Sequence, residues 1–178
     1  MIGMPVINPN DCGKFEKAVQ ALNIPDGKVL ASPICLTPTT IQELGDFPQW
    51  IYAIASSLTT DTSDPAVPPY QKILKAVGQG KLIGDPWTNV GFGEIATLAK
   101  FLNALGPTKL SSKGILAQMK AFKGPMVLGS PHIQCGKYKD APAICNDYTQ
   151  FYKYDGKFVF KKVGDWVPPP KGWVAPSG

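Results

Sequence analysis

Four cysteines and one histidine are the side chains of this sequence whose spacing says most about chemistry. The cysteines lie at positions 12, 35, 135 and 145, and the histidine is His132. No Cys-x-x-Cys pair occurs, so a tetrahedral zinc site would have to gather scattered ligands. Two disulfides are therefore favoured over a metal site, and the alternative is four buried thiols that pack as small apolar side chains. We expect neither a metal nor another cofactor.

Candidate catalytic residues are few. His132 follows Gly-Ser-Pro, with neither a nucleophile elbow nor zinc-protease spacing around it, so we interpret it as a loop histidine. The alternative is a triad with a nearby serine or cysteine. Glu94 lies near the start of a predicted helix, where a negative charge stabilises the helix N-terminus. The glycines beside Phe92 lack the lysine and Ser/Thr of a phosphate loop, and the sequence thus predicts a protein that is not an enzyme.

Composition sets further limits. The chain has 178 residues, 44% of them hydrophobic, which suffices for a sizeable core. No apolar run approaches the length of a membrane span. The net charge of +5 comes from lysine alone, because the sequence contains no arginine. Specific nucleic-acid recognition relies heavily on arginine, so we expect no nucleic-acid partner.

Strands and helices alternate in the segments that must position these residues. Residues 1–7 and 28–31 are predicted strands, and apolar residues repeat with helical spacing from Phe15 to Leu22 between them. Strand, helix and strand in this order are typical of a parallel βαβ unit. Further predicted elements are a short helix at 39–44, a strand at 49–57, a helix from Tyr70 to Gly78 and a helix that begins at Ser111 or Ser112.

The longest predicted helix begins near Gly91 and ends at Gly106 and Pro107. Its apolar residues recur at helical spacing, and we expect one face to be buried against a sheet. That face consists of Phe92, Ile95, Ala96, Ala99 and Leu102.

A terminal β-hairpin is predicted by Asp155 and Gly156, which separate the β-rich runs 148–154 and 157–161. Both central residues of a type I′ turn need positive φ, and Asp-Gly is a favoured pair for it. In an open parallel sheet, ligands bind beyond the carboxyl ends of the strands. Loops 5–10 and 31–36, with residues 87–92 before the long helix, therefore form the expected binding wall.

Several short motifs together resemble a known family. They are Asn-Pro-Asn-Asp-Cys at 8–12, Ser-Pro-Ile-Cys at 32–35, Pro-Tyr-x-x-Ile-Leu at 69–74, Gly-Phe-Gly-Glu-Ile-Ala at 91–96, the cysteine loop, and Tyr-x-x-Phe-x-x-Tyr-Asp-Gly-Lys at 148–157. In this order the chain resembles the C-terminal half of a type I periplasmic solute-binding protein, of the branched-chain amino acid ABC-transporter group. The resemblance covers nearly the whole chain.

This resemblance implies an incomplete α/β fold of the periplasmic-binding-protein type I class, with a parallel sheet, flanking helices and a C-terminal β-hairpin. Proteins of this kind have two lobes joined by three crossovers and bind solute by hinge closure. Residues 1–85 would belong to the second lobe and residues 86–130 would return to the first. Residues 131–178 would then close on the second lobe as a disulfide loop, hairpin and tail.

The resemblance also implies a function. The chain would belong to the substrate-binding component of an ABC-type importer, with a small organic solute as ligand. Its partners would be the membrane permease and the missing N-terminal half of the same protein. We expect a periplasmic or extracellular location, with tethering through an absent N-terminal signal. The alternatives are the ligand-sensing domain of a receptor and, from another class, a secreted hydrolase that uses His132.

The even number of cysteines, the lack of metal spacing and the resemblance together predict the pairs Cys12–Cys35 and Cys135–Cys145. The expected ligand-binding residues are Asn8, Ile34, Trp87 and Phe92, which would form one wall of the solute cleft.

The ligand expected in this cleft has no free ammonium group. Ile34 stands where amino-acid binders of the family carry the carboxylate that holds the ammonium group, and an unpaired charge in a cleft is costly. The opposite wall would come from the missing half, so this chain alone is expected to bind solute weakly.

Overall fold

The structure is a computed structural model that describes residues 1–4, 8–157 and 159–173. Residues 5–7 of the first predicted strand and binding loop, and Phe158 of the predicted hairpin, lie outside the described residues. The strands are β1 (Ile2–Met4), β2 (Val29–Ala31), β3 (Ile51–Ile54), β4 (Thr149–Tyr154) and β5 (Phe160–Val167). The helices are α1 (Cys12–Ala21), α2 (Pro38–Leu44), α3 (Val67–Ala76), α4 (Pro86–Leu105) and α5 (Ser112–Ala121). Short 3-10 turns are η1 (Pro9–Asp11), η2 (Asp26–Lys28), η3 (Pro33–Cys35), η4 (Gly80–Leu82) and η5 (Pro107–Lys109).

The five strands form one sheet in the order β1-β2-β3-β4-β5. Strand β2 pairs in parallel with both β1 and β3. Strand β4 runs antiparallel to β3, and β5 runs antiparallel to β4. The predicted α/β class is confirmed, and the sheet is mixed because the terminal hairpin joins the parallel strands directly.

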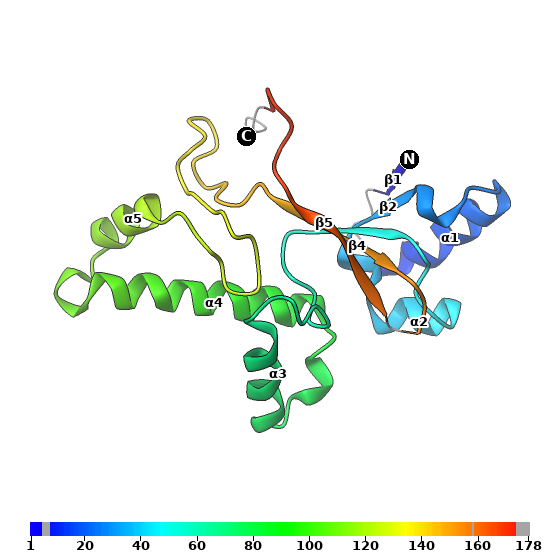
Figure 1. Cartoon of the computed structure of the whole chain (residues 1–178), viewed down its shortest axis with the longest axis horizontal. Helices are drawn as coiled ribbons and strands as arrows, with labels where there is room; N and C mark the ends of the chain where they lie inside the picture. The colour runs from blue at the N-terminus through cyan, green and yellow to red at the C-terminus, as the bar shows by residue number, and fades with distance from the viewer. Residues whose placement is uncertain (5–7, 158, 174–178) are drawn as a thin grey trace.

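Two bodies are visible in the fold (Figure 1). We call the sheet with α1 and α2 the sheet body, and residues 67–121, which carry α3, α4 and α5, the helical body. Each body has a separate cluster of buried apolar side chains. Tyr52 and Tyr152 belong to the cluster of the sheet body, whereas Val67 and Tyr70 belong to that of the helical body. Residues 55–66 and 122–148 join the bodies, and we call them the crossover segments.

The side chains of the sheet alternate between a buried face and a half-buried face. Tyr52, Tyr152 and Tyr154 lie on the buried face and are almost inaccessible to solvent. Phe15 of α1 packs edge-to-face on the ring of Trp50 at the start of β3, with ring centroids 5.6 Å apart. The helices of the sheet body therefore cover the face that carries the tyrosines.

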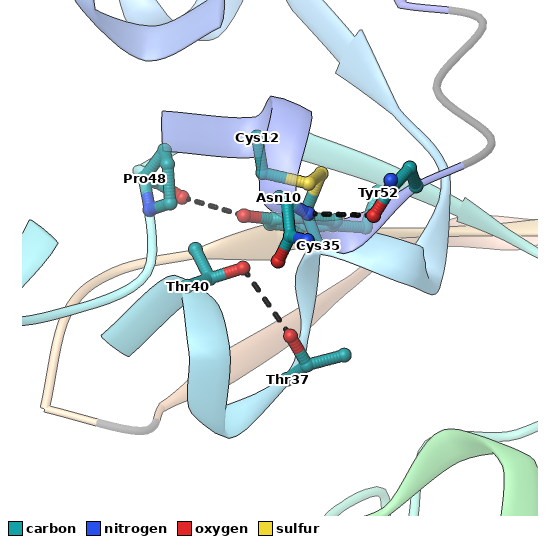
Figure 2. Close-up of a disulfide and its surroundings, with 8 residues drawn as sticks. Asn10, Cys12, Cys35, Thr37, Thr40, Pro48 and Tyr52 are labelled. Atoms are coloured by element: carbon teal, nitrogen blue, oxygen red, sulfur yellow. Dashed lines mark hydrogen bonds between the residues drawn. A yellow bond between two sulfur atoms is a disulfide. The ribbon is translucent and has the colours of Figure 1, made fainter. Parts of the chain in front are cut away.

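A disulfide fastens this packing. Cys12 at the start of α1 is bonded to Cys35 in η3, and both side chains are fully buried. Figure 2 shows the bridge beside Tyr52, whose hydroxyl donates a hydrogen bond of 3.0 Å to the carbonyl of Pro48. The bridge ties the first helix to the turn that follows β2.

The long helix begins five residues earlier than the sequence predicts, at Pro86 rather than near Gly91. The Asp85 side chain caps it and accepts hydrogen bonds from the backbone N–H groups of Trp87 and Thr88. Proline at the first helical position is favourable because its ring fixes φ and no N–H is lost. Residues 87–92 therefore lie within the helix rather than before it.

The predicted buried face of this helix is wrong. The buried side of α4 is instead a stripe at four-residue spacing that consists of Asn89, Gly93, Thr97 and Phe101. Ile95 is 68% exposed, and Ala99 is also exposed. The physical reason at the middle of the stripe is the partner. A Cβ atom at Gly93 would lie 2.4 Å from the carbonyl oxygen of Val127, so this part of α4 lies directly against backbone and needs a small residue.

The terminal hairpin is present, but its connection differs from the predicted two-residue turn. Strand β4 ends at Tyr154 and β5 begins at Phe160, and positive φ occurs at Gly156 and Lys157 rather than at Asp155. The N–H of Asp155 donates to the carbonyl of Val159 across this longer loop. Strand β5 then continues to Val167, beyond the predicted end at residue 161.

Candidate functional site

The two crossover segments pair with each other where they pass between the bodies. The N–H of Ser57 donates to the carbonyl of Leu128 at 2.9 Å, and Ser56 forms an antiparallel bridge with Gly129. Hydrogen bonding of this kind holds two strands of opposite direction at a fixed separation. The bodies are thus joined by two paired segments rather than by a single linker. We call residues 56–57 and 128–129 the paired strip.

Helix α4 holds both crossover segments. The Asn89 side chain donates to the carbonyl of Ser57 in the first segment. In the second segment, the N–H of Val127 donates to the Thr97 hydroxyl at 2.9 Å, and that hydroxyl donates to the carbonyl of Gly93. Because Asn89 and Thr97 are buried, these bonds are shielded from water. Helix α4 of the helical body therefore holds the paired strip in place.

A pocket of about 310 Å³ lies between the two bodies. We call it the interbody pocket. The sheet body contributes Leu36, Thr37, Pro38, Ile41, Phe47 and Phe160; the first crossover segment contributes Leu58, Thr59 and Thr60; and the helical body contributes Lys81, Leu82, Gly84, Asp85, Pro86 and Trp87. Most of these side chains are apolar, so the pocket suits a ligand with substantial apolar surface.

Among the residues that the structure describes, two charged side chains line the interbody pocket. The Oδ1 atom of Asp85 caps α4, with bonds of 2.7 and 3.0 Å to backbone N–H groups. Lys81 is exposed, and it forms no ion pair within the described ranges 1–4, 8–157 and 159–173. The pocket thus carries one carboxylate that is bound to the chain and one ammonium group without an ionic partner there.

A second, more polar pocket of about 330 Å³ lies beside the crossover segments, with Trp166, Lys100 and Lys162 among its lining residues. The Tyr152 hydroxyl donates to Asp61 at 2.7 Å, and the Ser57 hydroxyl donates to Asp64 at 2.6 Å. The Asp61 carboxylate therefore fastens the loop after β3 to the sheet, and the Asp64 carboxylate holds the two ends of that loop together.

The hydrogen bonds of the second pocket set the ionisation of its groups. Burial alone would raise the pKa of the Asp61 carboxyl, but hydrogen bonds from Ser63 and Tyr152 outweigh it and hold the pKa below its usual value. Burial and the bond to Asp61 raise the pKa of Tyr152. At neutral pH the pair is a carboxylate and a neutral phenol.

The four predicted ligand-binding residues lie in different environments. The Asn8 side chain caps η1 by accepting from the N–H of Asn10 at 3.0 Å, and Ile34 packs against the core of the sheet body. Phe92 packs edge-to-face on Tyr70 at 4.9 Å in the core of the helical body. Trp87 lines the interbody pocket and is 60% exposed. Of these four residues, the structure brings only Trp87 to this pocket.

Sequence reasoning missed most of the lining of the interbody pocket. Leu36 follows β2 and was found by the rule that ligands bind beyond strand ends. Phe47, Lys81 and Phe160 lie in or beside loops that carry no local signal of a binding site. Only the tertiary arrangement brings them together.

The catalytic alternatives gain no geometric support from the described contacts of His132. Its ring lies against Tyr148, with centroids 5.4 Å apart. The hydroxyl of buried Ser130 donates to the backbone carbonyl of His132 and accepts from its N–H. Glu94 is exposed in the helix interior, because α4 begins eight residues before it, so the predicted role at the helix N-terminus is wrong and Asp85 fills it.

All four cysteines form disulfides, in the pairs Cys12–Cys35 and Cys135–Cys145 expected from the sequence. Disulfides persist in oxidising environments, which indicates an extracellular or periplasmic location. Within the described part of the chain, no three or more His, Cys, Asp or Glu side chains gather as a metal-binding group. None of the helices formed by the described residues has the length and apolar character to cross a membrane.

No protein-family model, curated protein or solved structure matches this chain. The two bodies, the interbody pocket and the disulfides are the features of the molecule that bear on its function.

Proposed function

We propose that this chain is part of the substrate-binding component of an ABC-type importer and captures a small organic solute between its two bodies. The observation that carries the proposal is the interbody pocket, whose lining comes from both bodies. A ligand in such a pocket contacts both walls at once. Its binding energy therefore favours the arrangement in which the bodies are close together.

The connection between the bodies supports this proposal. Each body has its own buried cluster, and the paired crossover segments join the two. Closure of two rigid bodies around a ligand needs only a few residues that change their backbone angles. The bonds from Asn89 and Thr97 hold the paired strip to α4. The connections from this strip to β3 and β4, residue 55 and residues 130–148, are then the segments about which the sheet body would turn.

The pocket volume sets the size of the solute. At about 310 Å³ the pocket lies at the small end of the range usual for small-molecule sites, about 300 to 1,000 Å³, which suits a small organic solute. Two disulfides agree with a solute that is captured outside the cytosol. In this proposal the membrane permease and the N-terminal half of the same protein are the partners, and the protein binds its solute without converting it.

The proposal is tested by a solute screen on the 178-residue chain. Ligand-observed NMR with a panel of small organic solutes, followed by calorimetric titration of the hits, should find weak but saturable one-to-one binding, because in this proposal the N-terminal half adds further contacts. Trp87→Ala should weaken that binding, because Trp87 lines the pocket. Ile95→Ala removes another exposed apolar side chain of α4 outside the pocket, and it should leave the affinity unchanged. Binding that Trp87→Ala does not alter, or no saturable binding across the panel, would contradict the proposal.

A further inference from the structure

The charges at the interbody pocket distinguish between classes of solute. Asp85 is the one carboxylate among the described lining residues, and its Oδ1 atom accepts two backbone hydrogen bonds at the start of α4. The charge of this carboxylate is offset in part by the positive end of the α4 dipole, which weakens its attraction for a ligand cation.

An anion finds a better environment at the same pocket. Lys81 lines it in the turn η4, and within the described part of the chain its ammonium group has no carboxylate partner. Thr37, Thr59 and Thr60 also line the pocket, and a threonine hydroxyl can donate to an anion. A charge-assisted hydrogen bond from lysine is stronger than a neutral one.

The remaining lining is apolar and partly aromatic. Phe47 and Phe160 pack together, with ring centroids 6.2 Å apart, and Trp87 lies on the opposite body. Flat aromatic walls provide large contact areas for a ring or a short hydrocarbon chain. The ligand therefore combines one anionic head with an apolar tail.

We infer that the solute is a monocarboxylate with an apolar or aromatic tail and no ammonium group, and that Lys81 binds its carboxylate. This inference rests on the proposed function and adds the chemical class of the solute.

The test compares ligands of one shape with different heads. Phenylacetate, phenylacetamide and phenethylamine are titrated into the 178-residue chain at low salt, with hexanoate and hexanamide as a second pair and phenylalanine as the zwitterion. Phenylacetate should bind about tenfold more tightly than phenylacetamide, which corresponds to about 1.4 kcal/mol. Lys81→Gln should remove this preference and Lys81→Arg should keep it. Lys72→Gln, on the exposed surface of α3, is the matched control and should change nothing.

The outcomes separate the inference from the proposed function. If the amides bind as tightly as the acids, or if phenethylamine or phenylalanine binds best, the carboxylate inference is overturned while solute capture stands, provided that Trp87→Ala weakens the binding. An unchanged preference in Lys81→Gln would also overturn the inference. If no ligand of the series binds but another solute of the screen does, only the inference falls; if neither series nor screen gives binding, both fall.

Discussion

Gly93 is the position at which a single methyl group should disturb the connection between the bodies. A Cβ atom at Gly93 would lie 2.4 Å from the carbonyl oxygen of Val127, a separation that real Cβ atoms essentially never show. A Cβ atom at Gly91, on the same helix, would meet nothing within 4 Å. The substitutions Gly93→Ala and Gly91→Ala therefore form a matched pair.

The two variants should change stability in opposite directions. Alanine is favoured over glycine in a helix interior by about 1 kcal/mol, and Gly91→Ala should gain roughly this amount. At Gly93 the same gain is offset by overpacking, about 1 to 3 kcal/mol. The displaced backbone of Val127 also weakens its hydrogen bond to Thr97, which costs about 1 kcal/mol. We expect the free energies of unfolding of the two variants to differ by about 2 to 4 kcal/mol.

Urea unfolding followed by far-ultraviolet circular dichroism measures this difference. Amide hydrogen exchange at Val127 reports the same contact locally, and Gly93→Ala should speed this exchange whereas Gly91→Ala should not. Equal stabilisation by both substitutions would refute the contact between α4 and the second crossover segment.

Three other expectations concern single contacts. Replacing Cys135 and Cys145 by serine should lower the free energy of unfolding by roughly 2 to 3 kcal/mol, since the bridge closes a loop of about ten residues; free thiols in a non-reducing peptide map would contradict the bridge. Burial raises the pKa of Glu16 in the folded protein. The free energy of unfolding therefore falls as the pH rises from the ordinary pKa of the carboxyl to its raised pKa. Glu16→Gln should raise the melting temperature at pH 7, with a smaller effect near pH ~4. Phe101→Ala should lower the free energy of unfolding by about 3 to 5 kcal/mol, whereas Ile95→Ala, at an exposed position, should lower it by less than about 1 kcal/mol. Similar losses from both substitutions would argue against the observed buried stripe.

Elements with strong local signals were predictable from the sequence. Helix α5 begins after Ser111, whose hydroxyl accepts from the N–H of Gly114, and serine caps of this kind are visible in a sequence. The parallel order of β1, α1 and β2 follows from a short connection and from helical spacing in α1. The limits of the sequence appear at α4, because Gly93 and Thr97 lie against the backbone of Val127, and contacts of this kind leave no apolar pattern to detect.

The candidate site was predictable only in part. Trp87 was identified as a ligand-binding residue, although as part of a loop, whereas its position is the first turn of α4. Lys81 and Phe47 lie 34 residues apart in the numbering of the chain and reach one pocket only after the bodies are placed beside each other. No periodicity or spacing in a single sequence indicates that these two segments come together in the folded protein.

The most direct test of the central claim is to locate the bound solute. Isotope-filtered NOE spectroscopy of the 178-residue chain, with the tightest ligand of the solute screen, reports which side chains lie within about 5 Å of the ligand. Capture between the bodies predicts contacts from the same ligand to Trp87 of the helical body and to Phe47 or Phe160 of the sheet body. Contacts to one body alone, or to Trp166 in the second pocket, would contradict it.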